Sequence, residues 1–456
     1  MKQLDFREGS ITKSIVAGAV PMLIAQLVNL LYNLIDRVYI GRIPDVGSEA
    51  LGGLGLTFPV IIMITAFTNL YAGGGAPLFS IAMGGKKKVR AEAIMQQCLY
   101  LEAATAVVLM IIGISCAEPL LKLFGAGETA MLYSLPYLRI YLLGTVFSMI
   151  SIGMNPFINA QGFPMLGMIS VVTGAVLNLG LDPLFIFAFE MGISGAALAT
   201  IISQAVSAVI VFSILINKKM PLPLKLSFFS IKHPRVRLSL QIVTLGVASF
   251  VMQFTNALVN IVCNAVLSRT GGHLYISVMT VIASLRQVFE TPILAICEGA
   301  APFVSFNFGA DRIDRVKSGI RVMSVMSLVY TAVVWVLIMV FPAMFISIFS
   351  EDPEIMMDAV RATRIYFVAF LFMTLQYIGQ TSYKALNRRG RSIFFSIFRK
   401  VILVVPLTYL LPMIMEPAVN GVFAAEPVSN VIGGSASFVT MWYYVSHIAK
   451  NKGFAE

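Results

Sequence analysis

Long apolar stretches separated by short polar segments run through almost the whole chain. A helix needs about 20 apolar residues to cross a bilayer, because each residue adds only 1.5 Å of length. The pattern therefore predicts twelve membrane-spanning helices. They cover residues 14–40, 53–82, 92–116, 135–158, 165–189, 194–216, 238–267, 274–306, 319–348, 362–383, 393–414 and 420–446. The first stretch is longer than the apolar core of a signal peptide, so we expect it to be retained as the first span.

Composition agrees with this pattern. Hydrophobic residues make up 58% of the chain and charged residues 12%, whereas soluble domains contain roughly 25% charged residues. The mean hydropathy is +0.86. These values predict an all-α polytopic membrane protein and exclude a soluble enzyme with a single anchor. The histidines and cysteines show no zinc or disulfide spacing, and no nucleophile–base pair is visible, so we expect neither an enzyme nor a cofactor.

The basic residues are distributed unevenly between the two sides of the predicted membrane. The loops on the side of the N-terminus contain 23 Lys and Arg residues, and the opposite loops contain five. Cytoplasmic loops are enriched in these residues, so we expect both termini in the cytoplasm of a bacterial cell, in its cytoplasmic membrane. The net charge of +11 is then a topology signal that needs no nucleic-acid partner. We expect a monomer surrounded by membrane lipids.

Similar residues recur about half a chain apart. Residues 75–80 are echoed by 300–305, residues 139–141 by 364–366, and the offsets lie between 225 and 227. The amides Gln26, Asn29 and Asn33 are echoed by Gln253, Asn256 and Asn260. An internal repeat of six spans predicts two pseudo-symmetric six-helix bundles, residues 1–216 and 238–456, joined by a cytoplasmic linker at 217–237.

The two halves differ at their acidic positions. The repeat aligns Asp36 with Cys263, Asp182 with Thr408, and Thr200 with Glu426. On this comparison both carboxylates of a predicted polar cluster, Asp36 and Asp182, lie in the first half, whereas the second half contains only the corresponding amides. The charges inside the predicted spans are expected to be mainly acidic.

The acids of the first half are expected to lie close together. Asp36, Asp182 and Thr200 all fall in the outer half of their spans, and Asn178 precedes Asp182 by one helical turn. Two acids, an amide and a hydroxyl suit a proton or a hard cation such as sodium. The alternative is a hydrogen-bonded network that only fixes helix packing. The polar face of Gln26, Asn29, Asn33 and Asp36 is expected to point into protein or a wet cavity.

These features resemble the multidrug and toxic compound extrusion (MATE) family, and the resemblance covers nearly the whole chain. It is based on the two six-span halves and on Pro21 fifteen residues before Asp36. Further matches are Leu177–Pro183, Gly192–Ala197 leading into Thr200, and Cys297-Glu298-Gly299 before Ala301-Pro302. The resemblance implies a secondary active multidrug efflux antiporter that exports cationic or amphipathic compounds in exchange for protons or sodium through alternating access.

Residue roles follow from the same resemblance. In the DinF-like branch, the residues matching Asp36, Asn178, Asp182 and Thr200 form the proton or cation site, and the proline matching Pro21 is where the first span bends. The NorM-like branch also uses acids in spans 7 and 10, where this chain has none. We expect Glu298, Gln26, Asn33 and Asn260 to contribute to a substrate or proton site. The alternative function is a flippase of lipid-linked saccharides, which would be expected to show a cationic cavity for pyrophosphate.

Two further acids lie in predicted spans. Glu290 follows Arg286 by one turn, a spacing that predicts an internal ion pair. Glu102 has no obvious partner in the sequence.

Overall fold

The computed structural model describes residues 3–225, 235–349 and 353–447, and these residues form helices joined by short turns. Residues 226–234, in the predicted linker, lie outside the described part. The chain divides into two compact units. The first unit contains Pro21–Phe250 and the described residues before Phe6, and the second contains Phe6–Val20 and the described residues from Val251 onward.

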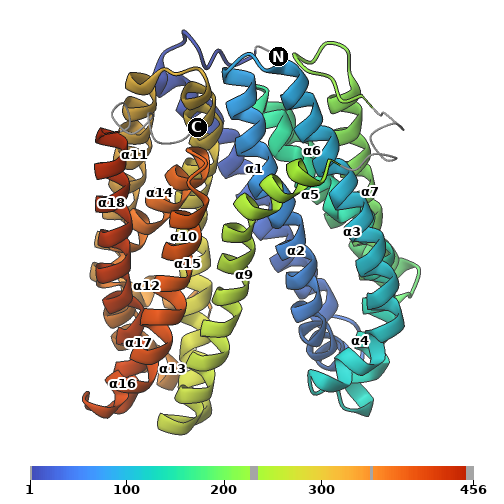
Figure 1. Cartoon of the computed structure of the whole chain (residues 1–456). Coiled ribbons are helices and arrows are strands. Elements are labelled where there is room, and N and C mark those ends of the chain that lie inside the picture. Colours follow the sequence, from blue (N-terminus) through green and yellow to red (C-terminus); the bar gives the residue numbers. More distant parts are fainter. Residues whose placement is uncertain (1–2, 226–234, 350–352, 448–456) are drawn as a thin grey trace. The chain divides into compact units, whose positions relative to one another are not determined.

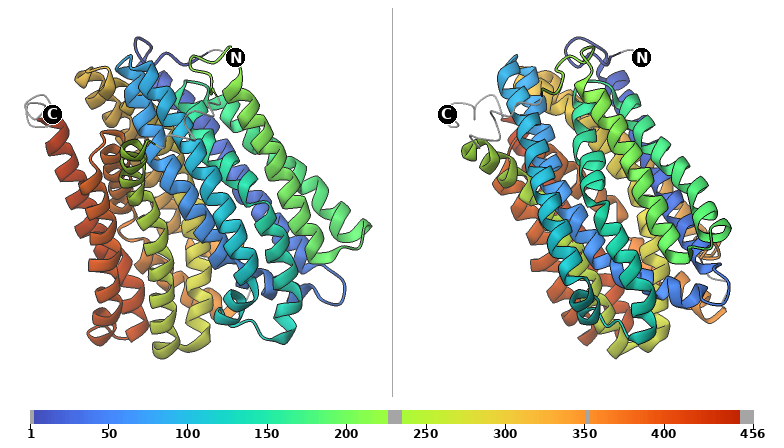
Figure 2. Two further views of the ribbon diagram at one scale, coloured as in Figure 1. Left: turned by 45° about the vertical axis from the view of Figure 1, so that its right-hand side comes forward. Right: turned by 90° about the vertical axis from the view of Figure 1, so that its right-hand side faces the viewer.

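The first unit is built from long apolar helices. Its helices are the second part of α1 (Ile11–Gly41), α2 (Gly47–Gly84), α3 (Lys88–Leu123), α4 (Glu128–Leu143), α5 (Thr145–Ala160), α6 (Pro164–Pro183), the π-helical η1 (Leu184–Ala188), α7 (Gly192–Ile216) and the first part of α9 (Val236–Thr270). Figure 1 shows α2 and α3 side by side along much of their length, and Figure 2 shows the same helices from two further directions. Phe79 and Phe157, both fully buried, pack edge to face with ring centroids 5.4 Å apart.

The fourth predicted span, residues 135–158, is a broken helix. Helices α4 and α5 meet at Gly144 with a bend of 55°. A Cβ atom at Gly144 would lie 2.6 Å from Ile201 of α7, so only glycine allows the backbone to approach α7 this closely. The break therefore follows from packing against α7.

The second unit has shorter and more interrupted helices. They are the first part of α1, the second part of α9, α10 (Gly272–Gly309), α11 (Ile313–Val340), α12 (Pro342–Ile346), α13 (Pro353–Phe367), α14 (Phe370–Ala385), α15 (Arg389–Ile397), η2 (Phe398–Val404), α16 (Val405–Leu410), η3 (Leu411–Met413), α17 (Ala418–Ser429), η4 (Asn430–Gly434) and α18 (Ser435–Ser446). The segments η2 and η4 are π-helical, and η3 is a 3-10 helix.

The prediction of an all-α polytopic membrane protein is confirmed. Within the described ranges, nine helices are long and apolar enough to cross a membrane, and the bent α4–α5 pair makes a tenth. The predicted spans at 362–383 and 420–446 fall on helices that are interrupted. The first is split between α13 and α14, and the second contains Pro427 and the π-helical η4. Proline removes a backbone donor, and both proline and π turns are common causes of a kink in a helix.

Helices α1 and α9 are each divided between the units. Residues Phe6–Val20 belong with the second unit, and the part of α9 that ends at Phe250 belongs with the first. In the second unit, Asn307 donates a hydrogen bond to the carbonyl oxygen of Phe6 at 3.0 Å. In the first, a Cβ atom at Gly246 would overlap the backbone of Leu70, so α9 and α2 touch through their main chains. The predicted division into two six-helix bundles joined by a linker at 217–237 follows from the sequence repeat and stays a prediction.

Candidate ion and substrate sites

The candidate first-unit site comprises the four predicted residues Asp36, Asn178, Asp182 and Thr200. Asp36 lies on α1, Asn178 and Asp182 on α6, and Thr200 on α7, which packs along α6. All four side chains are buried, and Asp182 is fully inaccessible. The Nδ2 atom of Asn178 donates to Oδ1 of Asp182 at 3.2 Å, as the one-turn spacing on α6 allows. Asp36 and Asp182 are close enough to interact electrostatically. The structure thus brings both acids of the first half together.

Several oxygens of this site have no hydrogen-bond partner among the described residues. They are Oδ1 of Asp36, Oδ2 of Asp182 and Oδ1 of Asn178. The hydroxyl of Thr200 donates to the Ala196 carbonyl at 3.0 Å, which leaves its lone pairs available. A buried carboxylate without donors is costly, so such oxygens need a proton or a cation. The donor set fits a proton or a hard cation such as sodium, which prefers oxygen ligands.

A site built only from acidic, histidine or cysteine ligands is not available here. In the portions of the chain that the structure describes, no three such side chains come close enough to hold a metal ion. A sodium ion would therefore depend on the amide and hydroxyl oxygens as well as on the two carboxylates.

Two tyrosines border the first-unit site and were missed by the sequence reasoning. Tyr32 and Tyr137 both interact electrostatically with Asp36 and Asp182. Tyr32 precedes Asp36 by one helical turn, and that spacing was a usable signal. The approach of Tyr137 from α4 is a tertiary contact that no local spacing announces.

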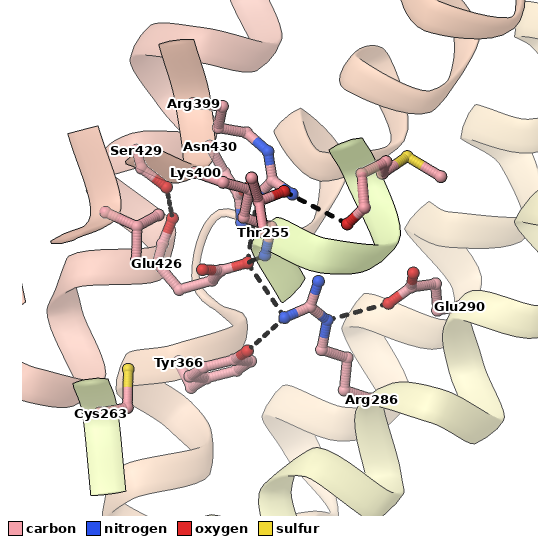
Figure 3. A network of polar contacts seen from close by, with 12 residues as sticks. Thr255, Cys263, Arg286, Glu290, Tyr366, Arg399, Lys400, Glu426, Ser429 and Asn430 are labelled. Carbon is pink, nitrogen blue, oxygen red and sulfur yellow. Dashed lines mark hydrogen bonds and ion pairs between the residues drawn. The ribbon is translucent and has the colours of Figure 1, made fainter. Parts of the chain in front are cut away.

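The second-unit cluster consists of Glu426, Arg286, Arg399 and Lys400, which come from α17, α10 and η2 (Figure 3). One oxygen, Oε1 of Glu426, lies 3.0 Å from Nη1 of Arg286, 3.0 Å from Nη1 of Arg399 and 2.8 Å from Nζ of Lys400. Arg399 also donates to Oδ1 of Asn430 at 2.6 Å. The side chains of Arg399, Lys400 and Glu426 are only 3–5% exposed.

The edge of the second-unit cluster is a second ion pair. Nε of Arg286 donates to Oε2 of Glu290 at 2.9 Å, which confirms the ion pair expected from their spacing. Nη1 of Arg286 also donates to the hydroxyl of Tyr366 at 2.9 Å, and the hydroxyl of Tyr377 donates to Glu290. The side chains of Arg286 and Glu290 are 14% and 15% exposed, so this pair lies closer to the surface of the unit.

The cluster corrects two expectations from the sequence. The second half was expected to keep only amides, and the charges within the spans were expected to be mainly acidic. Instead the second unit buries one acid, Glu426, beneath three basic side chains. Glu426 aligns with Thr200 of the first half, so the alignment already held the signal.

The other predicted polar residues lie outside the two sites. Glu298 is exposed on α10 and interacts electrostatically with Lys384 of α14. Asn33 and Asn260 are also exposed. Gln26 is half-buried on α1.

Glu102 is a different case, because it is fully buried on α3. Neither carboxylate oxygen has a hydrogen-bond partner within the described residues, in agreement with the absence of an obvious partner in the sequence. A Cβ atom at Gly153 of α5 would overlap this carboxyl group, so the glycine provides the space that it occupies.

Comparison with known proteins assigns the chain to a family. The family model described as MatE matches it twice, over residues 21–184 and again over residues 248–410. The chain belongs to the MatE family. The second match begins 227 residues after the first, so the family pattern itself is repeated, as the sequence predicted. MatE proteins are membrane transporters and not enzymes.

Individual relatives resemble this MatE protein over most of its length. The multidrug export protein MepA of Staphylococcus haemolyticus is 27% identical over 376 residues, which are 82% of this chain and 80% of that protein. MepA of Staphylococcus saprophyticus is 25% identical over 89% of this chain and 88% of its own. A solved structure described as the outward-facing conformation of a multidrug resistance MATE family transporter superposes with a TM-score of 0.91. It is 22% identical and covers 99% of both chains, so it shows the shared fold.

Proposed function

We propose that this protein exports cationic or amphipathic drug-like compounds by antiport, with the first-unit site loading the coupling ion. The observation that supports this most directly is the pair of buried carboxyl groups, Asp36 and Asp182. Each has one oxygen, Oδ1 of Asp36 and Oδ2 of Asp182, with no hydrogen-bond donor in the described chain. Such oxygens bind a proton or a cation and release it when the site opens to water. The curated relatives are named multidrug export proteins, which supports drug-like substrates.

Protons are our first choice of coupling ion, and sodium is the alternative. Two adjacent acids in a low dielectric need only one shared proton to remove their mutual repulsion. Sodium must lose its water shell and find about five or six oxygens, by analogy with other hard cations. The described site offers two carboxylates, one amide oxygen and one hydroxyl.

Pro21 is proposed as the hinge of α1. The contact-based boundary between the units falls at this residue, and α1 continues as a helix on both sides of it. Proline removes one backbone hydrogen bond and crowds the preceding turn, so the helix is weakest there. In alternating access, ion loading at Asp36 would change the bend at Pro21, and substrate would leave on the outside. Exposed Glu298, Asn33 and Asn260, with Gln26, are the proposed substrate contacts.

We further propose a monomer in the bacterial cytoplasmic membrane with both termini in the cytoplasm. The Lys and Arg bias between the two sets of loops supports this orientation. In a background without the natural cysteines, a thiol reagent that cannot cross membranes should label a cysteine introduced at Lys219 only after the cells are opened. Labelling of intact cells would reverse the orientation.

The test of the proposed function is dye flux in liposomes. Purified protein should move a cationic fluorescent dye under a pH gradient without sodium, and Asp36→Asn should abolish this flux while the variant still inserts and binds dye. The asparagine keeps the shape of the aspartate and removes its ionisable group. Flux that requires a sodium gradient and does not occur with a pH gradient would identify sodium as the coupling ion. Full flux by the Asp36→Asn variant would show that Asp36 does not bind the coupling ion.

A flippase of lipid-linked saccharides remains the second candidate, because the second unit contains a basic cluster that such a function would use. All three basic side chains, however, contact Glu426, and two of them are almost fully buried. They are therefore engaged internally rather than presented to a pyrophosphate. Translocation of a lipid-linked sugar, with no dye flux under either gradient, would favour the flippase.

A further inference from the structure

The two units repeat the same arrangement of helix positions with different chemistry. In the second unit, Sγ of Cys263 lies 3.9 Å from Oγ1 of Thr408, and Cys263 interacts electrostatically with Glu426. These residues are the repeat counterparts of Asp36, Asp182 and Thr200. The positions that form the first-unit site therefore also meet in the second unit.

The basic residues are what the second unit adds. Lys400 stands 226 residues after Gly174, and Arg399 stands 226 residues after Thr173. The first unit thus has no side chain with a charge at either position. Its carboxylates keep oxygens without partners, whereas Glu426 is surrounded by cations that belong to the chain. In the first unit, Arg37 is the one cation that interacts electrostatically with Asp36 in the described residues, whereas three cations meet at one oxygen of Glu426 in the second-unit cluster.

The excess can be counted. The titratable groups that face Lys400 from its own element and from the elements around it are Arg399 on η2, Glu426 on α17, Arg286 and Glu290 on α10, Tyr366 on α13, Tyr377 on α14 and Cys263 on α9. Tyrosine and cysteine side chains are ordinarily neutral at pH 7. Three cations therefore stand against two acids in this group.

A buried surplus of one charge is unfavourable. Desolvation of an ion costs several kcal/mol, and only a partner of opposite charge offsets that cost. The three cations share a single oxygen of Glu426, so they repel one another at close range. Nε of Arg399 has no hydrogen-bond partner among the described residues, so this guanidinium is only partly compensated.

Only one of the three cations can relieve the surplus by losing a proton. Arginine stays protonated in proteins, which excludes Arg286 and Arg399. A buried lysine gives up its proton readily, and the Lys400 side chain is only 3% exposed. When its ammonium group releases a proton to water and becomes a neutral amine, two arginines face two glutamates and the cluster is neutral.

We infer that Lys400 is a proton-exchange site in the second unit, separate from the carboxylates of the first unit and opposite to them in charge. The inference deepens the proposed function, because an exchangeable proton here would contribute to the proton coupling of the antiport. In the first unit, proton binding cancels excess negative charge. At Lys400, proton release cancels excess positive charge. Without these protons the first-unit acids therefore keep an excess of negative charge, whereas the second-unit cluster is neutral.

The first experiment counts protons without any transport. Purified protein in detergent is acidified through the neutral range, and proton uptake is followed with an indicator dye for wild type, Lys400→Arg and Lys400→Met. The arginine keeps the charge and cannot release it, whereas methionine keeps the length and has no charge. Both variants should take up one proton fewer than wild type. Lys317→Arg is the matched control, because Lys317 is only half-buried in the same unit and its ammonium group donates to the Ser446 carbonyl rather than to an acid.

The second experiment measures dye flux in liposomes as a function of pH. Lys400→Arg should show a weaker pH dependence of flux in the neutral range than wild type, because only the first-unit carboxylates still exchange protons. The arginine preserves the ion pair with Glu426, so a lysine with a merely structural role would leave the pH dependence unchanged. Wild-type proton uptake and wild-type flux in Lys400→Arg would overturn the inference and leave the proposed function intact. If wild type moves no dye, the proposed function fails, and proton counting still decides on Lys400.

A small bound anion is the competing way to cancel the surplus. It predicts that Lys400→Arg transports like wild type and that replacing chloride by gluconate destabilises both proteins equally. That pair of results would overturn the assignment of Lys400. If the Lys400→Arg variant does not fold, the proton-uptake measurement is made on Lys400→Met instead. Uptake by Lys400→Met equal to that of wild type would then refute the inference.

Discussion

Replacing Glu426 by glutamine should destabilise the second unit strongly. The substitution preserves the volume of the side chain, so no cavity forms and the loss is electrostatic. Three charged donors now converge on one oxygen of Glu426 at 2.8–3.0 Å. Breaking a buried ion pair by removing one partner costs about 3–5 kcal/mol, because the other charge stays behind without compensation. Lys400 can become neutral and relieve part of this, so we expect about 3 kcal/mol.

This magnitude can be measured by thermal unfolding of the purified protein in detergent. For domains of this size, 1 kcal/mol changes Tm by about 2–4 °C, so Glu426→Gln should lower Tm by roughly 6–12 °C. Glu118→Gln is the control, because its ion pair with Lys122 is solvent-exposed and should leave Tm unchanged. Adding Lys400→Met to Glu426→Gln should restore part of the loss, with a coupling energy of about 0.5–3 kcal/mol.

Two results would refute the reasoning. A Glu426→Gln variant as stable as wild type would mean that the cations are already compensated by other groups. Strict additivity of Glu426→Gln and Lys400→Met would mean that the two side chains do not interact in the folded protein.

Three further predictions concern helix contacts, substrate charge and the first-unit site. Gly246→Ala should destabilise the protein by about 1–3 kcal/mol, because the added methyl overlaps backbone of α2, whereas Gly55→Ala, with no atom within 4 Å, should be neutral or slightly stabilising in the same unfolding assay. Glu298→Gln should reduce flux of a cationic dye more than that of a neutral one, and equal losses would argue for a folding effect instead. Asp36→Cys combined with Thr200→Cys, in a background without the natural cysteines, should crosslink with a short reagent. Failure to crosslink in every condition would show that positions 36 and 200 do not lie close together.

The fold class and the proximity of Asp36 to Asp182 could be predicted from the sequence for the same reason. Both depend on regularities that can be read along the chain: the length of apolar runs, the depth of each acid within its run, the one-turn spacing of Asn178 and Asp182, and the constant repeat offset. Burial in a bilayer leaves the backbone few options other than helix, so apolar length alone identifies most spans.

The second-unit cluster could not be predicted in this way, because two of its basic members lie where the helical register is irregular. Arg399 and Lys400 lie on a π-helical segment, η2, whose register differs from that of an α-helix. Spacing along the chain therefore does not tell which way their side chains point. The same holds for the predicted spans that contain breaks, since the bend at Gly144 depends on the approach of α7, far away in sequence.

The division of α1 and α9 has an evolutionary consequence. Each six-span repeat gives the beginning of its first helix to the other unit: Phe6–Val20 is packed with the second, and the start of α9 with the first. This reciprocal exchange is the connectivity of a domain-swapped homodimer, in which two identical subunits trade the same segment. Joining the subunits of such a dimer end to end would produce the present chain without breaking any contact. By the same reasoning, either repeat expressed alone would lack the segment that its unit receives from the other repeat, so it would be complete only when paired.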